Sequence, residues 1–113
     1  MNPKTKRQLE RILTFAKRVR QRTKSVSIET FLNDDFLQDA VVYCLGQMGE
    51  IACKIPEEEQ EKYPDLFWNQ MTGLRHRLFH DYEAIDFSMI YHVTQEPISQ
   101  MVLKLESILS REA

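Results

Sequence analysis

Apolar residues recur every three or four positions along most of the chain, which is the period of a helix that buries one face. This pattern predicts a first helix over about residues 4–23. A second helix follows residues 33–35 (Asn-Asp-Asp), which offer side-chain oxygens for an N-terminal cap, and it ends at Pro56. Gly46 and Gly49 lie inside this second helix. Because glycine is a poor helix former, we expect another helix to pack closely against them.

Between and after these two helices the signals are shorter. Ser27 is suited to cap a short helix that reaches Leu32. Residues 56–64 form an acidic connector between two prolines, which we expect to be a solvated loop or a frayed helical turn. Pro64 fits the start of a further helix, because proline is favoured in the first helical turn, and this helix should end near His80.

The last periodic segment predicts a long C-terminal helix. Asp86 is suited to its N-cap, the apolar pattern continues to about Ser110, and Pro97 should kink the helix because proline removes one backbone hydrogen bond. No segment shows the strict alternation of a strand. We therefore predict an all-α fold, an up-and-down bundle of four main helices plus a short helix, in a single domain over residues 1–113.

A bundle of this size has a limited core, and the chain carries six Phe, four Tyr and one Trp. The large apolar side chains that compete for the interior are Phe36, Phe67, Trp68, Phe79, Phe87 and Tyr91. They cannot all be central. We expect some of them to lie at a subunit interface and therefore predict a homodimer.

The charge is unevenly distributed along the chain. The formal net charge is −2, but residues 1–24 contain nine Lys or Arg and one acid, whereas residues 25–113 contain six basic and sixteen acidic residues. The chain is therefore not a uniformly basic nucleic-acid coat. The basic first helix could follow an RNA backbone or could dock against the acidic connector, and the sequence does not decide between the two.

The two cysteines and the apolar runs indicate a cytoplasmic protein without a membrane segment. Cys44 and Cys53 lie nine residues apart in one predicted helix, too far for a disulfide, and free thiols suit a reducing compartment. The longest apolar run, residues 40–45, is far shorter than a membrane span. The N-terminus is basic but lacks the apolar core of a signal peptide.

Several kinds of site are disfavoured. With three glycines, the chain has no glycine-rich loop for a nucleotide phosphate. His76 and His80 have the i, i+4 spacing of a zinc-binding pair. However, Arg77 stands where a zinc protease would carry Glu, and no third ligand follows at a typical spacing. We predict no metal and no cofactor.

The densest chemistry lies in residues 73–82, which contain two arginines, two histidines, an aspartate and a tyrosine. An arginine can hold a phosphate with a bidentate fork, and a histidine can take and return a proton near neutral pH. Together they suffice for metal-free cleavage of RNA, whose 2′-hydroxyl can act as the nucleophile. Arg75 and His80 lie about 140° apart around a helix, so a helix ending near His80, or a second copy of the chain, would have to complete the site. The alternative is a charged helix end that only solvates the bundle.

These residues carry a resemblance to a known family. Arg75, His80 and Tyr82 match the R-x4-H-x-Y motif of HEPN-domain toxins, in the HepT-like branch. The resemblance covers nearly the whole chain and includes residues 27–32, 39–41, 49–50, 68, 73–74 and 85–86.

The resemblance implies a dimeric helical bundle and a metal-independent endoribonuclease, the toxin of a type VII toxin–antitoxin pair. By position, Arg75 would bind the scissile phosphate and His80 would transfer protons, with His76, Arg77 and Asp81 in supporting roles. The residue after the motif arginine is often Asn in this branch, and its replacement by His76 opens a shared acid–base role.

The resemblance also implies the partners. These are an RNA substrate, a second copy of the chain, and a minimal nucleotidyltransferase antitoxin in a larger hetero-oligomer. The antitoxin would transfer AMP from ATP to Tyr82, and the added charge and bulk would repel RNA. The alternative function is a non-catalytic module of the same fold that presents nucleotide or substrate to a nucleotidyltransferase.

Overall fold

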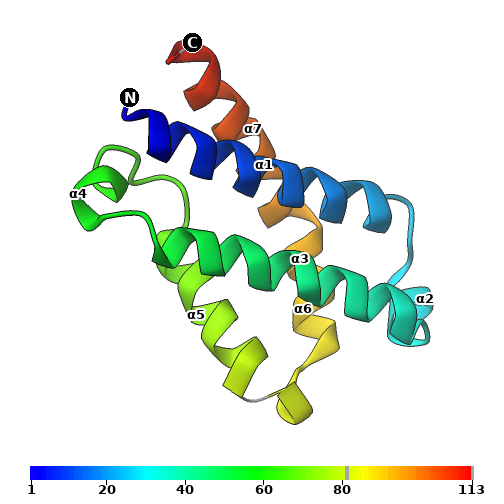
Figure 1. Ribbon diagram of the computed structural model, residues 1–113. Coiled ribbons are helices and arrows are strands. Elements are labelled where there is room, and N and C mark those ends of the chain that lie inside the picture. Colours follow the sequence, from blue (N-terminus) through cyan, green and yellow to red (C-terminus); the bar gives the residue numbers. More distant parts are fainter. Residues whose placement is uncertain (81, 113) are drawn as a thin grey trace.

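The computed structural model describes residues 1–80 and 82–112, with Tyr82 described by its backbone alone. The helices are α1 (Pro3–Thr23), α2 (Ile28–Leu32), α3 (Asp35–Cys53), α4 (Glu57–Gln60), α5 (Trp68–His80), α6 (Phe87–Thr94) and α7 (Glu96–Arg111), with a 3-10 turn, η1, at Tyr82–Ala84. Figure 1 shows them as a helical bundle, and the described residues contain no strand. The predicted all-α fold is confirmed.

Three helix N-caps predicted from the sequence are confirmed by side-chain hydrogen bonds. The Ser27 hydroxyl accepts from the Thr30 N–H at 3.1 Å at the start of α2. The Asp34 carboxylate accepts from the Leu37 N–H at 2.9 Å at the start of α3, and Asp86 caps α6. Each cap satisfies a backbone N–H that has no partner inside its helix.

The prediction that a helix starts at Pro64 is wrong. The helix α5 begins at Trp68, and the preceding Phe67 has a φ of 55°, which a right-handed helix cannot contain. The Trp68 indole N–H donates to the Tyr63 carbonyl at 2.8 Å and thereby fixes the turn before the helix. This side-chain-to-backbone hydrogen bond accompanies a helix start at Trp68 instead of Pro64.

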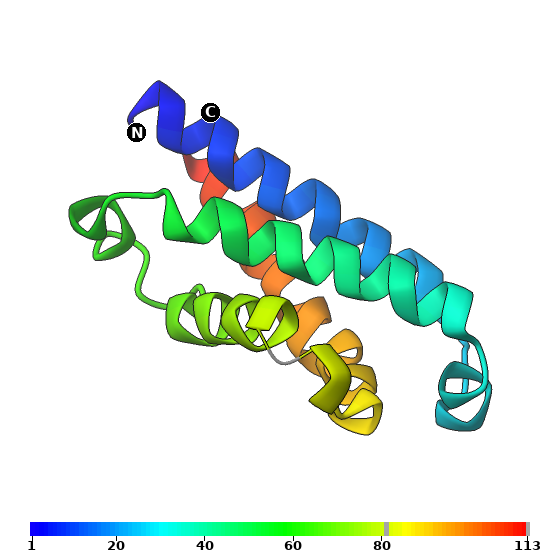
Figure 2. The ribbon, with the colours of Figure 1, turned by 60° about the horizontal axis from the view of Figure 1, so that its bottom comes forward.

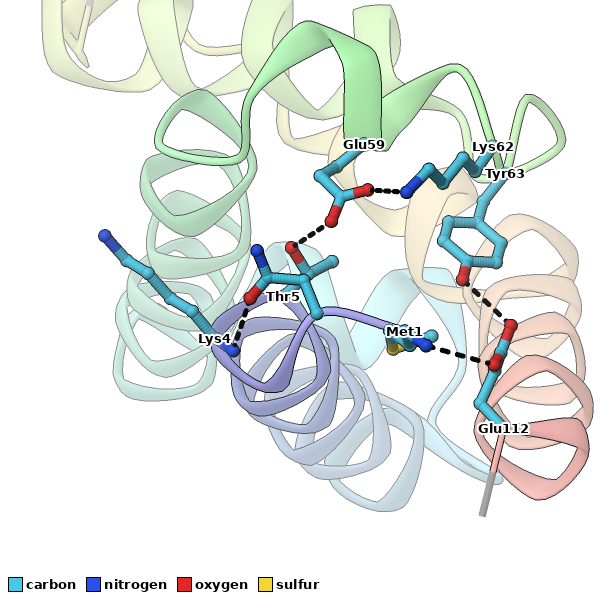
Figure 3. Close-up of polar contacts among 8 residues, drawn as sticks. Met1, Lys4, Thr5, Glu59, Lys62, Tyr63 and Glu112 are labelled. Carbon is cyan, nitrogen blue, oxygen red and sulfur yellow. Dashed lines mark hydrogen bonds and ion pairs between the residues drawn. The ribbon is translucent and has the colours of Figure 1, made fainter.

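The acidic connector is also more ordered than predicted. It contains the helix α4, and Glu59 within it is buried, with 6% of its surface exposed. The Thr5 hydroxyl donates to the Glu59 carboxylate at 3.3 Å, and the Lys62 ammonium lies 2.6 Å from its other oxygen (Figure 3). This network attaches the connector to the first turn of α1.

Pro97 breaks the C-terminal helix instead of kinking it. Gln95 has a ψ of −113°, far from helical, and separates α6 from α7. Proline has no N–H for the carbonyl four residues back, but it fits the first turn of α7, where N–H groups have no partner inside the helix. The segment predicted as one long helix is therefore two helices.

The helix α3 lies between α1 and α5, while α7 packs on α1 and α6 packs on α7. Figures 1 and 2 show α1 and α3 side by side along most of their lengths. The largest fully buried side chains are Phe31, Leu9, Ile12, Leu66, Ile90 and Leu105.

The two glycines of α3 mark its close approach to α5, as predicted. A Cβ at Gly49 would lie 2.5 Å from the Arg75 Cβ and 2.6 Å from the Met71 carbonyl oxygen. A Cβ at Gly46 would lie 3.1 Å from the Phe79 ring. These contacts place α5 directly against the α3 backbone.

Two further predictions concern the thiols and the membrane. Both cysteines are free, with Cys44 buried and Cys53 exposed. Within the described residues, no helix combines the length and the apolar character needed to cross a bilayer.

Candidate functional site

The helix α5 carries the motif, and its periodicity gives each motif residue a different environment. Its buried face consists of Trp68, Met71, Leu74 and Leu78. Arg75 is half-buried against α3, whereas His76, Arg77 and His80 are exposed. The helix ends at His80, as the sequence predicts.

The Arg75 guanidinium is held by a carboxylate from α3. Its Nε donates to Oε2 of Glu50 at 2.6 Å, and both side chains are about one-third exposed, at 32% and 33%. The Lys54 ammonium lies 3.7 Å from the other Glu50 oxygen. The hydrogen bond from Arg75 is the main reason that the Glu50 pKa lies below its ordinary value, and the same bond raises the Arg75 pKa.

Two further contacts restrict the Arg75 side chain. Its Cβ packs on Gly49, and its Cζ lies 5.7 Å from the centre of the Phe79 ring. Among the described residues, none accepts a hydrogen bond from the two terminal nitrogens of Arg75. The guanidinium is therefore oriented through Nε, and the described residues leave its terminal N–H groups without an acceptor.

His76 and His80 form an exposed pair one helical turn apart. Their ring centroids are 4.5 Å apart and the rings are tilted by 40°. Within the described residues, no group of three or more His, Cys, Asp or Glu side chains is arranged to hold a metal ion. The pair offers four ring nitrogens that can accept or donate protons at the surface.

A single chain brings some of the predicted site residues together and leaves others apart. His76 and His80 are neighbours, but Arg75 bonds to Glu50 on α3, about 140° around α5 from His80. Arg77 lies on another side of α5, where it lines a groove of about 450 Å³ between α5 and the α6–α7 segment. Asp81 and the side chain of Tyr82 lie outside the described residues.

Sequence reasoning gave no role to Glu50 and Phe79 in positioning Arg75. Glu50 is 25 residues from Arg75, so no local spacing links the two. The available signal was the Gly49-Glu50 pair, because a glycine that admits a second helix places its neighbour next to that helix. Phe79 is four residues after Arg75 on the same helix face, a spacing at which side chains meet.

Comparison with known proteins gives consistent results. The model of the HepT-like family, whose description is "Ribonuclease HepT-like", matches residues 12–108. The chain is 31% identical over 104 residues to "Putative RNase TTE0752" of Caldanaerobacter subterraneus, covering 92% of this chain and 93% of the relative. It is 30% identical over 98 residues to "Putative RNase MJ0125" of Methanocaldococcus jannaschii, covering 87% and 84%. It is 28% identical over 100 residues to "Probable ribonuclease HepT" of Thermococcus cleftensis, covering 88% and 91%. No solved structure matches the chain at a significant level.

Proposed function

Because this chain belongs to the HepT-like ribonuclease family, we propose that it is the RNA-cleaving toxin of a type VII toxin–antitoxin pair and that it works without a metal ion. The observation that carries the proposal is the Arg75 guanidinium. It is anchored through Nε to Glu50 and belongs to the same helix as an exposed histidine pair. This arrangement supplies a phosphate clamp and a proton carrier on one helix.

The reaction that fits these groups is attack of the ribose 2′-hydroxyl on the adjacent phosphorus. A neutral His80 accepts the 2′-hydroxyl proton, the new O2′–P bond forms, and the P–O5′ bond breaks. A protonated histidine, His76 in this proposal, returns a proton to the 5′ oxygen. The products are a 2′,3′-cyclic phosphate and a 5′-hydroxyl. Arg75 stabilises the charge that develops on the non-bridging oxygens.

We propose that two copies of the chain complete the site. Arg75 and His80 point to different sides of one α5 helix, so one copy does not aim both at one phosphate. Phe79 is 54% exposed beside Arg75, and Phe36 on α3 is 85% exposed. Burying these rings against a second copy would stabilise a homodimer and bring two motifs together.

Neutralisation is proposed to occur at Tyr82, two residues beyond His80. The Tyr82 hydroxyl would attack the α-phosphorus of ATP, forming an O–P bond to AMP and releasing pyrophosphate. A minimal nucleotidyltransferase antitoxin would catalyse this transfer within a larger hetero-oligomer. The bound AMP adds a negative charge and bulk next to the proton carrier, and both oppose the approach of an RNA phosphate.

The test is expression of the chain without its partner, followed by measurement of growth and RNA integrity. The wild type should cleave RNA and His80→Ala should not. If both leave RNA intact, the catalytic role fails. The non-catalytic module that presents nucleotide to a transferase then becomes the better description. Intact mass after incubation with the transferase and ATP should rise by AMP in the wild type and stay constant in Tyr82→Phe.

A further inference from the structure

The exposed face of α1 carries a stripe of cations. At 100° per residue its members fall within a wedge of about 60°, and they extend over roughly 27 Å of helix. All are exposed to solvent. The stripe consists of Lys4, Arg7, Arg11, Arg18 and Arg22.

The described part of the chain does not pair with this stripe. Among the described residues, none of its five members takes part in an ion pair. The ion pair that α1 does make with α7 uses Lys17, on another side of the helix, with Glu106 at 3.4 Å. The stripe is therefore available to an anion from outside the chain.

The acidic connector does not dock on the stripe either. Its buried carboxylate, Glu59, is bonded to Thr5 and Lys62 (Figure 3). Thr5 belongs to the buried face of α1 and not to the stripe. The connector therefore docks on α1 through its buried face at Thr5, and this docking leaves the exposed stripe uncovered.

Aromatic rings lie beside the cations. The Arg18 guanidinium lies 5.3 Å from the centre of the Phe15 ring. Phe15 in turn meets Tyr43 of α3 edge to face, with centroids 6.1 Å apart. The Tyr43 side chain is 60% exposed. Cations interleaved with accessible rings are typical of surfaces that bind single-stranded nucleic acid, because phosphates meet the cations and bases stack on the rings.

The stripe and the motif approach the same exposed face of α3 from opposite sides. Tyr43, which contacts Phe15 of α1, and Glu50, which holds Arg75 of α5, are seven residues apart and so lie about 20° apart around α3. Two interhelical spacings separate α1 from α5, a path of up to about 20 Å. A flexible strand of several nucleotides can span that distance.

We propose that the α1 stripe is an RNA-binding track, independent of base sequence, for the single strand that flanks the cleaved phosphate. The proposal rests on the ribonuclease function proposed above and extends it from the scissile phosphate to the neighbouring nucleotides. Polyanion binding by several cations should depend strongly on salt, with about threefold loss of affinity per contact between 50 and 200 mM salt.

The experiment measures binding of a fluorescent 20-nucleotide single-stranded RNA to full-length protein carrying His80→Ala, which prevents cleavage. Arg11→Gln/Arg18→Gln should weaken binding about tenfold and reduce the salt slope by about 1.4. The matched control, Lys6→Gln/Lys24→Gln, removes the same charge outside the stripe, from another side of α1 and from its C-cap, and should bind like its parent.

Equal binding by the two double variants would overturn the track. So would a stripe variant that binds RNA normally but no longer co-purifies with the transferase, because the stripe would then be a protein-docking face. Failure of the proposed function is distinguishable. In that case the chain with His80 intact cleaves no RNA at all, whatever the stripe variants do to binding.

Discussion

The Nε of Arg75 donates a 2.6 Å hydrogen bond to Oε2 of Glu50, which joins the motif helix α5 to α3. A buried arginine would need its partner for stability, but this pair is one-third exposed and water screens it. Its effect is therefore orientation. Glu50 fixes where the guanidinium points by accepting from Nε, and it does not occupy the two terminal nitrogens.

Removal of this anchor should lower activity more than it lowers stability. Glu50→Ala is expected to reduce kcat/KM for RNA about tenfold or more, since a phosphate clamp displaced by about 1 Å loses catalytic power. Glu50→Gln retains an acceptor for Nε and should retain most of the activity. Steady-state kinetics beside a thermal melt tests this, and a loss of activity that tracks the loss of folding in both variants would contradict the positioning role.

The helix approach at Gly49 makes a second prediction about packing. Gly49→Ala places a methyl group 2.5 Å from the Arg75 Cβ, so we expect destabilisation of about 1–3 kcal/mol by urea unfolding. The control is Gly73→Ala on α5, where no atom outside its chain neighbours and its own helix backbone lies within 4 Å of the new methyl. That substitution should stabilise by about 0.5–1 kcal/mol because alanine favours the helix. Equal effects at the two glycines would argue against the close approach.

Acid should weaken the attachment of the connector to α1. The Lys62 ammonium is the main reason that the Glu59 pKa lies below its ordinary value of 4.5. A carboxylate with a lowered pKa in the folded state stabilises the fold above its unfolded-state pKa. That contribution is lost as the pH falls through the folded-state value.

Thermal melts between pH 7 and pH 3 test this contribution. Glu59→Gln, which keeps an acceptor for Thr5 but cannot pair with Lys62, should melt below the wild type at pH 7. The two melting temperatures should converge as the pH falls below about 4.5. A gap of constant size across the whole range would show that the charge of Glu59 is not responsible.

The two thiols should differ in reactivity. Burial raises the pKa of the Cys44 thiol and also excludes reagent, whereas Cys53 is exposed at the end of α3. Iodoacetamide is expected to add one group quickly in the native protein and a second only after unfolding in guanidinium. Peptide mapping should place the first group on Cys53, and early modification of Cys44 would contradict the burial.

Catalysis should survive removal of metal ions. Since the proposed reaction uses Arg75 and histidines alone, EDTA should leave RNA cleavage unchanged, while His80→Ala should reduce it by about 10²–10⁴-fold. His76→Ala tests the second proton transfer, to the 5′ oxygen, separately from the first. It should reduce the cleavage rate less than His80→Ala does if the partner copy can supply the second proton. Loss of cleavage with chelator, restored by zinc, would instead favour a metal role for the His76/His80 pair.

The features that the sequence predicts well are those that depend on neighbouring residues. Ser27, Asp34 and Asp86 cap helices as predicted, because a cap requires only the residue and the two or three that follow it. The start of α5 could not be predicted in this way. It depends on the hydrogen bond from Trp68 to Tyr63 and on the left-handed Phe67, which override the usual preference of Pro64 for a first turn.

In the candidate site, too, the features that depend on neighbouring residues could be predicted and the contacts between helices could not. The motif residues on α5 follow from sequence spacing, and the meeting of His76 with His80 is a direct result of the i, i+4 period. The partnership of Arg75 with Glu50 joins two helices and depends on how closely they pack. The surroundings of the Arg75 and Arg77 side chains likewise depend on the neighbouring helices. Arg75 packs against α3, whereas Arg77 lines the groove beside α6 and α7.

The cation stripe on α1 has a practical consequence for purification. A net charge of −2 would suggest that the protein binds only to anion exchangers at neutral pH. An adsorbent, however, meets one face of a molecule at a time, and the face around Arg11 and Arg18 is strongly positive. We expect the chain to be retained on sulfonate or heparin resin as well, and to elute from them with nucleic acid from the host unless it is washed at high salt.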